Sequence, residues 1–167
     1  SLYVALLEEV SPRDIRKLAF QALYQLDVRG EATPEELTAS VAAESELSTK
    51  AVATAVSRAI AAYRDRAKAD KMMEELAPGW PVYRQAAVDR AILRLAHWEM
   101  TSGLTSPKIV VNEAVELAKA FSTDKSPAFV NGLLDKVLKQ VLAAGITGPL
   151  VPQDAPLSDI SPDGALS

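Results

Sequence analysis

Four Ser–Pro or Thr–Pro pairs stand directly ahead of apolar residues with helical spacing, and this repeated pattern constrains the fold most. The pairs are Ser11–Pro12, Thr33–Pro34, Ser106–Pro107 and Ser126–Pro127. A serine or threonine hydroxyl caps the free N–H groups of a first helical turn, and proline fits that turn because its N–H would have no helical partner there. The pairs therefore predict four helix starts.

The apolar residues after these starts recur every three or four positions, as on the buried face of an amphipathic helix. The same periodicity predicts a long helix over about residues 49–76, capped by Ser48, and a strongly apolar helix that ends at Gly103. A short turn or helix precedes the latter. Because no run of alternating β-branched residues is present, we expect an all-α fold of about seven helices.

Length and composition favour one intracellular domain. The chain has 167 residues, 49% of them apolar, which is enough for a single hydrophobic core. It contains no cysteine, so disulfides and thiolate metal sites are excluded. No apolar run reaches the roughly 20 residues of a membrane span. We therefore expect a soluble cytoplasmic protein that does not enter a membrane.

The net charge of −4 is concentrated at the C-terminal end. Residues 143–167 contain three aspartates, no lysine or arginine, and many prolines and glycines, which predicts a disordered acidic tail. Residues 1–11 form an N-terminal extension that either lengthens the first helix or adds a short one. The remaining body, residues 12–142, is nearly neutral and can still carry a local basic patch.

Two asparagines and a glycine interrupt the helices at the C-terminal end of the body. Asn112 and Asn131 each follow a valine, and Gly132 comes next to the second asparagine. All three are poor helix formers. We interpret the asparagines as a buried amide contact where two helices cross, and Gly132 as the point where another backbone approaches closely.

Four sequence blocks occur in an order that is typical of one family. They are "RKLAFQALYQLD", "VDRAILRLAHWEM", "VVNEAVELAKAF" and "SPAFVNGLLDKVL", with Trp80 and Arg84 ahead of the second block. In this order and spacing, the chain from about Pro12 to Leu142 resembles the NusB family of bacterial transcription antitermination factors. The resemblance implies a compact bundle in two packed subdomains, with no catalytic activity and no cofactor.

The resemblance also implies partners. NusB proteins bind boxA RNA together with NusE, a ribosomal protein of the small subunit, within an RNA polymerase complex that reads through terminators in ribosomal RNA operons. By similarity, the residues expected to contact RNA are Arg13, Arg16, Lys17, Tyr24 and Lys108. Pro12 and Asp14 stand where the family often has basic residues, so the basic motif is thinned. A few cations at a helix start can still contact phosphates, and a tyrosine can stack on an unpaired base.

The expected NusE-binding residues are Asp89, Asp124 and Phe129. Lys125 departs from the family, which frequently has an acidic residue at this position, and the reversed charge changes the electrostatic match with the partner. By spacing alone, Asp89 could instead form a surface ion pair, and Phe129 could belong to the core.

Three other functions stay open from the sequence. An enzyme would need reactive groups, yet His97 is the only histidine and lies on an apolar helix, and no glycine-rich phosphate loop is present. A NusB-like domain also occurs at the front of certain ribosomal RNA cytosine methyltransferases, which would make this chain a fragment. A helical adaptor that binds only protein would fit the thinned basic motif.

Overall fold

The structure, a computed structural model, describes residues 11–30 and 32–148. These residues form seven α-helices and one 3-10 turn, and they contain no strand. The elements are α2 (Pro12–Arg29), α3 (Pro34–Ala43), α4 (Thr49–Arg64), α5 (Arg66–Leu76), η1 (Val82–Arg84), α6 (Ala87–Ser102), α7 (Pro107–Phe121) and α8 (Ser126–Ala143). The all-helical prediction is confirmed.

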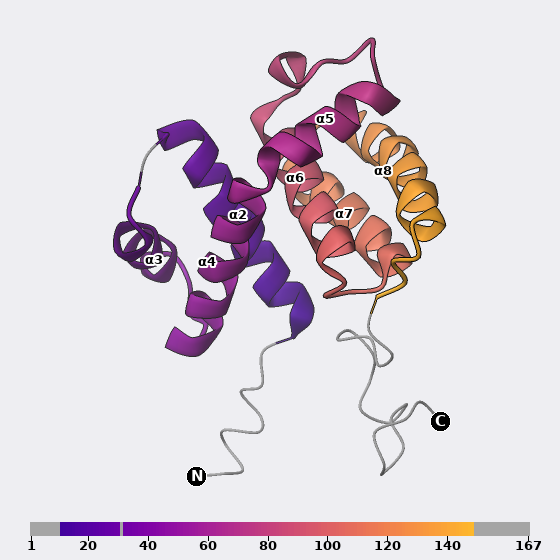
Figure 1. The fold of residues 1–167 in the computed structure, drawn as a ribbon. Helices are drawn as coiled ribbons and strands as arrows, with labels where there is room; N and C mark the ends of the chain where they lie inside the picture. The colour runs from indigo at the N-terminus through magenta and orange to yellow at the C-terminus, as the bar shows by residue number, and fades with distance from the viewer. Residues whose placement is uncertain (1–10, 31, 149–167) are drawn as a thin grey trace, which may run out of the picture.

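The helices form two groups that share one core (Figure 1). Helices α2, α3 and α4 lie together on one side, and α5 to α8 on the other, with α2 and α4 packing against α6 between them. Buried residues of all seven α-helices, such as Leu23, Ile92 and Leu134, belong to a single hydrophobic cluster, and Met73 is the member from α5. The 3-10 turn η1 contributes no buried residue to this cluster.

The predicted caps are confirmed at the first two Pro-containing starts. The hydroxyl of Ser11 accepts a hydrogen bond from the Asp14 amide at 3.2 Å, and that of Thr33 accepts one from the Glu36 amide at 3.1 Å. The prediction is wrong for Ser126, which is the first residue of α8 rather than its cap. Its hydroxyl donates to a carboxylate of α6 instead, as described below.

The predicted long helix over residues 49–76 is two helices. Asp65 separates α4 from α5, and its carboxylate lies 2.6 Å from Nδ1 of the buried His97 on α6. The guanidinium of Arg66 turns back to donate to the Tyr63 carbonyl at 2.7 Å and covers the Tyr63 ring. Apolar periodicity does not detect this break, because neither glycine nor proline marks it. After the break, α5 packs on α6 and α8.

An ionic cluster joins α2, α5 and α6 at the end of α2. Arg94 donates to both Asp70 and Asp27, at 2.7 and 3.0 Å, and Arg90 donates to Asp27 through Nε at 3.0 Å. Burial alone would lower the pKa of Arg94, but hydrogen bonds and charge from Asp70 and Asp27 outweigh burial and raise that pKa above its ordinary value. The guanidinium therefore stays charged and ties the two groups of helices together.

The chain remains packed after α8. Ile146 is partly buried against the core, and Gly148 adopts a φ of +88° with its backbone against Ser106. A Cβ at Gly148 would lie 2.8 Å from the Ser106 Cα, so this position requires glycine. The predictions for residues 1–10 and for the acidic tail beyond residue 148 lie outside the described residues.

Candidate nucleic-acid and protein interfaces

The start of α2 and the end of α7 enclose a surface hollow of about 220 Å³. Its lining consists of Arg13, Arg16, Lys17, Glu113, Glu116, Leu117, Ala120 and Phe121. Three predicted RNA-contacting residues, Arg13, Arg16 and Lys17, are therefore brought to one place. We call this hollow the α2–α7 site.

Arg13 is exposed at the α2–α7 site and pairs with an acid of α7. Its side chain is 69% exposed, and its guanidinium donates to both carboxylate oxygens of Glu113, from Nε at 3.0 Å and from Nη2 at 2.8 Å. A fork of this kind is the geometry in which arginine also grips a phosphate. Glu113 thus orients Arg13 and occupies the donors that a phosphate would use.

Arg16 differs from its expected role. It is only 4% exposed, and its Nε donates to both oxygens of the buried Glu99 on α6, at 3.1 and 3.0 Å. Its Nη1 lies 3.8 Å from Glu113. A guanidinium buried in this way holds α2 against α6 and α7, so direct contact with RNA does not fit its placement. Sequence spacing alone could not distinguish Arg16 from the exposed Arg13.

Phe121 is a candidate residue that sequence reasoning missed. It is the last residue of α7, is 38% exposed, and rests on Phe20 with the ring centroids 5.2 Å apart. The ammonium of Lys17 lies 5.6 Å from the centroid of the same ring. In this arrangement the exposed aromatic ring can stack on an unpaired base while the neighbouring cation neutralises the phosphate of that nucleotide. The signal available in the sequence is an aromatic residue directly before the polar run "STDK".

The other predicted RNA-contacting residues lie elsewhere. Tyr24 is partly buried against the core, two helical turns beyond Lys17 on α2, and does not line the α2–α7 site. Lys108 is exposed on the first turn of α7, at the end opposite Phe121. Neither residue therefore lines the α2–α7 site.

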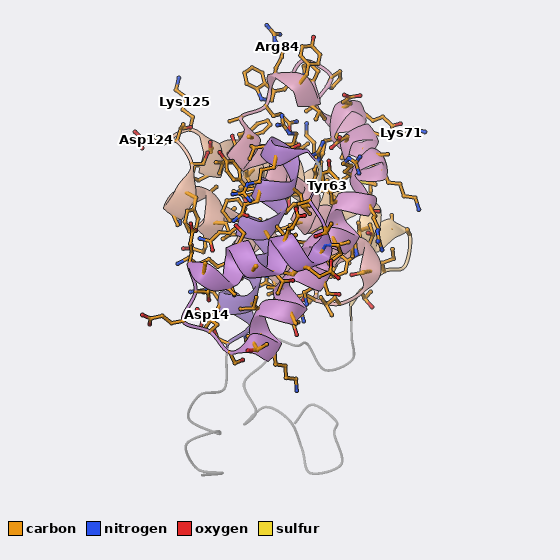
Figure 2. All side chains as sticks on the ribbon, turned by 90° about the vertical axis from the view of Figure 1, so that its left-hand side faces the viewer. Asp14, Tyr63, Lys71, Arg84, Asp124 and Lys125 are labelled. Carbon is orange, nitrogen blue, oxygen red and sulfur yellow. The ribbon has the colours of Figure 1, made fainter. Side chains whose placement is uncertain are left out.

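Asp89 is not the free surface acid that the resemblance implied. It is 8% exposed, and it accepts hydrogen bonds from the hydroxyls of Ser122 and Ser126 at 2.7 and 2.9 Å. Ser122 directly follows α7 and Ser126 begins α8, so Asp89 holds the turn between these helices in place. Asp124 and Lys125, at the tip of the same turn, are exposed and point away from the molecule (Figure 2).

Phe129 is partly buried against the core, and we call it, together with the exposed Trp80 and Tyr83, the aromatic patch. Its ring packs edge-on against Trp80, with the centroids 6.2 Å apart. Trp80 is nearly half exposed, and Tyr83 of η1 is 83% exposed. Exposed aromatic side chains of this size are enriched in protein–protein interfaces. The patch therefore fits a protein partner.

The asparagines of the C-terminal helices are not buried, which overturns our interpretation of them. Asn112 and Asn131 are exposed and line one groove between α7 and α8. Gly132 is also exposed, and a Cβ at this position would meet nothing within 4 Å. No neighbouring backbone approaches it, so its cost of about 1 kcal/mol relative to alanine has no packing reason.

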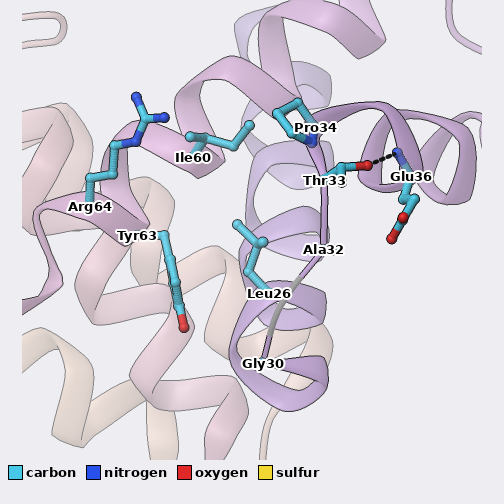
Figure 3. A pocket seen from close by; sticks show the side chains of 9 residues that line it. All are labelled: Leu26, Gly30, Ala32, Thr33, Pro34, Glu36, Ile60, Tyr63 and Arg64. Carbon is cyan, nitrogen blue, oxygen red and sulfur yellow. Dashed lines mark hydrogen bonds between the residues drawn. The ribbon is translucent and has the colours of Figure 1, made fainter.

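A larger hollow of about 600 Å³ lies at the other end of α2 (Figure 3). Leu26, Ile60 and Tyr63 form its apolar wall, and the capped start of α3 at Thr33 forms its rim. This hollow contains none of the predicted RNA- or partner-binding residues.

Neither a metal site nor a membrane span is found in the part of the chain that the structure describes. Within it, no group of three or more His, Asp or Glu side chains could hold a metal ion. None of its helices is both long and apolar enough to cross a membrane. His97 is buried and bonded to Asp65, so it lines neither the α2–α7 site nor the aromatic patch.

These features define an all-helical protein with a cationic, aromatic surface at one end of α2 and a separate aromatic patch beside α8. Residues 13–139 match the NusB family, and the chain belongs to that family. It is 37% identical to the transcription antitermination protein NusB of Symbiobacterium thermophilum over 87% of this chain and 100% of that protein. It is 42% identical to the NusB of Rubrobacter xylanophilus over 79% of this chain and 96% of that protein.

Solved structures show the same fold. Thermotoga maritima NusB superposes with a TM-score of 0.69 at 27% identity, covering 79% of this chain and 93% of that one. A crystal structure of antitermination factors NusB and NusE in complex with double-stranded RNA matches with a TM-score of 0.67 at 28% identity, covering 77% of this chain and 96% of that one.

Proposed function

We propose that this protein is a transcription antitermination factor that binds boxA RNA of ribosomal RNA operons together with NusE. The observation that carries the proposal is the α2–α7 site, where Arg13, Lys17 and Phe121 present two cations and an exposed ring on one surface. Family membership and the relatives named as antitermination proteins supply the biological context.

At the α2–α7 site, Lys17 and Arg13 contact phosphates while Phe121 stacks on an unpaired base. Arg13 exchanges the carboxylate of Glu113 for a phosphate, because one guanidinium fork cannot hold both. Arg16 acts by position, since its buried bonds to Glu99 fix the start of α2 against α6. Two cations give weak affinity and a small salt slope of about one unit per phosphate contact, so a protein partner is needed to strengthen the complex.

The NusE surface in this proposal is the aromatic patch with the turn between α7 and α8. Phe129, Trp80 and Tyr83 provide the apolar contacts, and Asp124 provides charge at the rim. Asp89 supports this surface from below through Ser122 and Ser126. Lys125 beside Asp124 alters the charge that NusE meets, so the cognate NusE is expected to carry a matching acid there.

The binding unit in this proposal is residues 12–142, and it binds without catalysing a reaction. Because such a factor joins RNA polymerase during transcription, we place it in the cytoplasm. The two relatives described above carry the antitermination name, which favours an antitermination factor over the methyltransferase alternative. The protein-only adaptor remains as the second candidate, because Arg16 is buried and the basic motif is thinner than expected.

The deciding experiment measures binding of a short boxA RNA with and without NusE from the same cell, across a salt series. NusE should strengthen RNA binding, and Lys17→Ala and Phe121→Ala should each weaken the ternary complex about tenfold. Lys71→Ala on α5 is the control, because Lys71 is exposed and does not line the α2–α7 site (Figure 2). Capture of NusE with no gain in RNA affinity would replace the proposal with the adaptor.

A further inference from the structure

The groove between α7 and α8 has a composition that the core does not explain. It encloses about 400 Å³ and is lined by Asn112, Val115, Glu116, Lys119, Pro127, Ala128 and Asn131. Both asparagines are exposed, so neither amide was placed there to satisfy a buried partner. Two amides on facing helices are suited to recognise the donor and acceptor groups of a ligand.

Gly132 gives an independent observation. It lies one turn after Ala128 on the same face of α8, because residues four apart are stacked along a helix. The backbone there is open, since an added Cβ would meet nothing within 4 Å. A helix-breaking residue at an exposed position inside a long helix lowers stability without improving packing. A ligand that approaches the α8 backbone beside Asn131 would account for it.

Charge identifies the kind of ligand. Lys119 lies at one end of the groove, and the exposed Lys108 stands one turn before Asn112, at the other end. Lys119 pairs with Glu116 at 3.3 Å, and both side chains are more than half exposed, so the pair exchanges readily with solvent. Lys108 and Lys119 therefore place one cation near each end of the groove.

We propose that the α7–α8 groove binds a single-stranded RNA segment that continues from the α2–α7 site. Glu116 lines both hollows, so they adjoin across one helix. In the groove, an unpaired base lies over Gly132 with its edge hydrogen-bonded to the amides of Asn112 and Asn131, and Lys108 and Lys119 contact the flanking phosphates. This inference rests on the proposed function, because it extends the path of the same RNA.

A peptide fits the groove less well. Peptide grooves hold their ligands with large apolar pockets or aromatic anchors. The apolar lining here is limited to Val115, Pro127 and Ala128, while amides and charges make up the rest. The large exposed aromatic side chains of Trp80 and Tyr83 lie in the aromatic patch and do not line this groove.

Gly132→Ala is the sharpest test, because it should raise the stability of the folded protein and weaken its binding of RNA. The added methyl meets nothing in the free protein, so the thermal midpoint should rise by about 2–4 °C. In the RNA complex the methyl meets the base, and RNA affinity in the presence of NusE should fall about tenfold. A raised midpoint with unchanged RNA affinity would overturn the groove assignment.

Asn112→Ala and Asn131→Ala should each weaken RNA binding about tenfold with little change in salt dependence, since the amides contact a base. Lys119→Ala should instead lower the salt slope by about one unit. Gln140→Ala is the matched control, being an exposed amide further along α8. The thermal midpoint of each variant confirms folding.

The outcomes separate this inference from the proposed function. If Lys17→Ala weakens RNA binding and the two asparagine variants do not, the α2–α7 site stands and the groove assignment fails. If the wild-type protein with NusE binds no RNA, both fail. If the asparagine variants lose NusE and keep any RNA binding of the protein alone, the groove binds protein, which overturns the inference.

Discussion

Arg16→Met should destabilise the fold far more than Arg13→Met, although the two arginines stand one turn apart on α2. Arg16 is 4% exposed and donates to both oxygens of the buried Glu99, whereas the Arg13 side chain is 69% exposed. Removing one partner of a buried ion pair leaves the other charge without compensation, at a cost of about 3–5 kcal/mol. Removing an exposed partner costs about 0–1 kcal/mol.

The measurement is equilibrium unfolding in urea, with the slope and midpoint fitted for each variant. The double variant Arg16→Met, Glu99→Met should recover most of the lost free energy of unfolding, because it removes both charges and keeps the volume. Arg13→Met is the matched control on the same helix. A loss below about 1 kcal/mol for Arg16→Met, or no recovery in the double variant, would refute the structural role that we assign to Arg16.

Three further predictions concern the candidate interfaces. Asp89→Ala should lower the free energy of unfolding by about 2–3 kcal/mol, because the hydroxyls of Ser122 and Ser126 lose their acceptor. Asp124→Ala is the control and should leave thermal unfolding unchanged. Equal effects of the two variants would contradict this account. Glu113→Gln should raise RNA affinity a few-fold in an anisotropy titration at low salt by releasing Arg13, and a fall in affinity would show that Glu113 is needed to orient the guanidinium. Tyr83→Ala should weaken NusE capture about tenfold or more by calorimetry with the RNA-free protein, without changing stability, since the ring is 83% exposed; unchanged capture would remove η1 from the partner surface.

Helix existence could be predicted from the sequence because capping is a local property. The hydroxyls of Ser11 and Thr33 accept hydrogen bonds from amides three residues away, so their capping role depends on neighbouring residues alone. The break at Asp65 could not be predicted in this way. Its carboxylate bonds to His97 on another helix, and the chain direction after Asp65 is set by packing on α6 and α8.

The candidate site shows the same division between local and distant effects. The family resemblance singled out Arg13, Arg16 and Lys17 as RNA-contacting residues, and all three line the α2–α7 site. Exposure, however, depends on residues far along the chain, because Glu99 buries Arg16 and the serines after α7 cover Asp89. For the same reason, the sequence does not reveal that Asn112 and Asn131 are exposed, because their exposure depends on how α7 and α8 pack.

The α2–α7 site is built from two segments that lie far apart in the sequence, and this determines when it can exist during synthesis. Arg13 and its partner Glu113 are 100 positions apart, and Phe121 emerges later still. A ribosome therefore releases the cations of α2 well before the ring and acids that complete the surface. Until α7 has left the exit tunnel, the nascent chain exposes the basic residues of α2 without their acidic partners on α7. RNA can then meet these basic residues before the finished site exists.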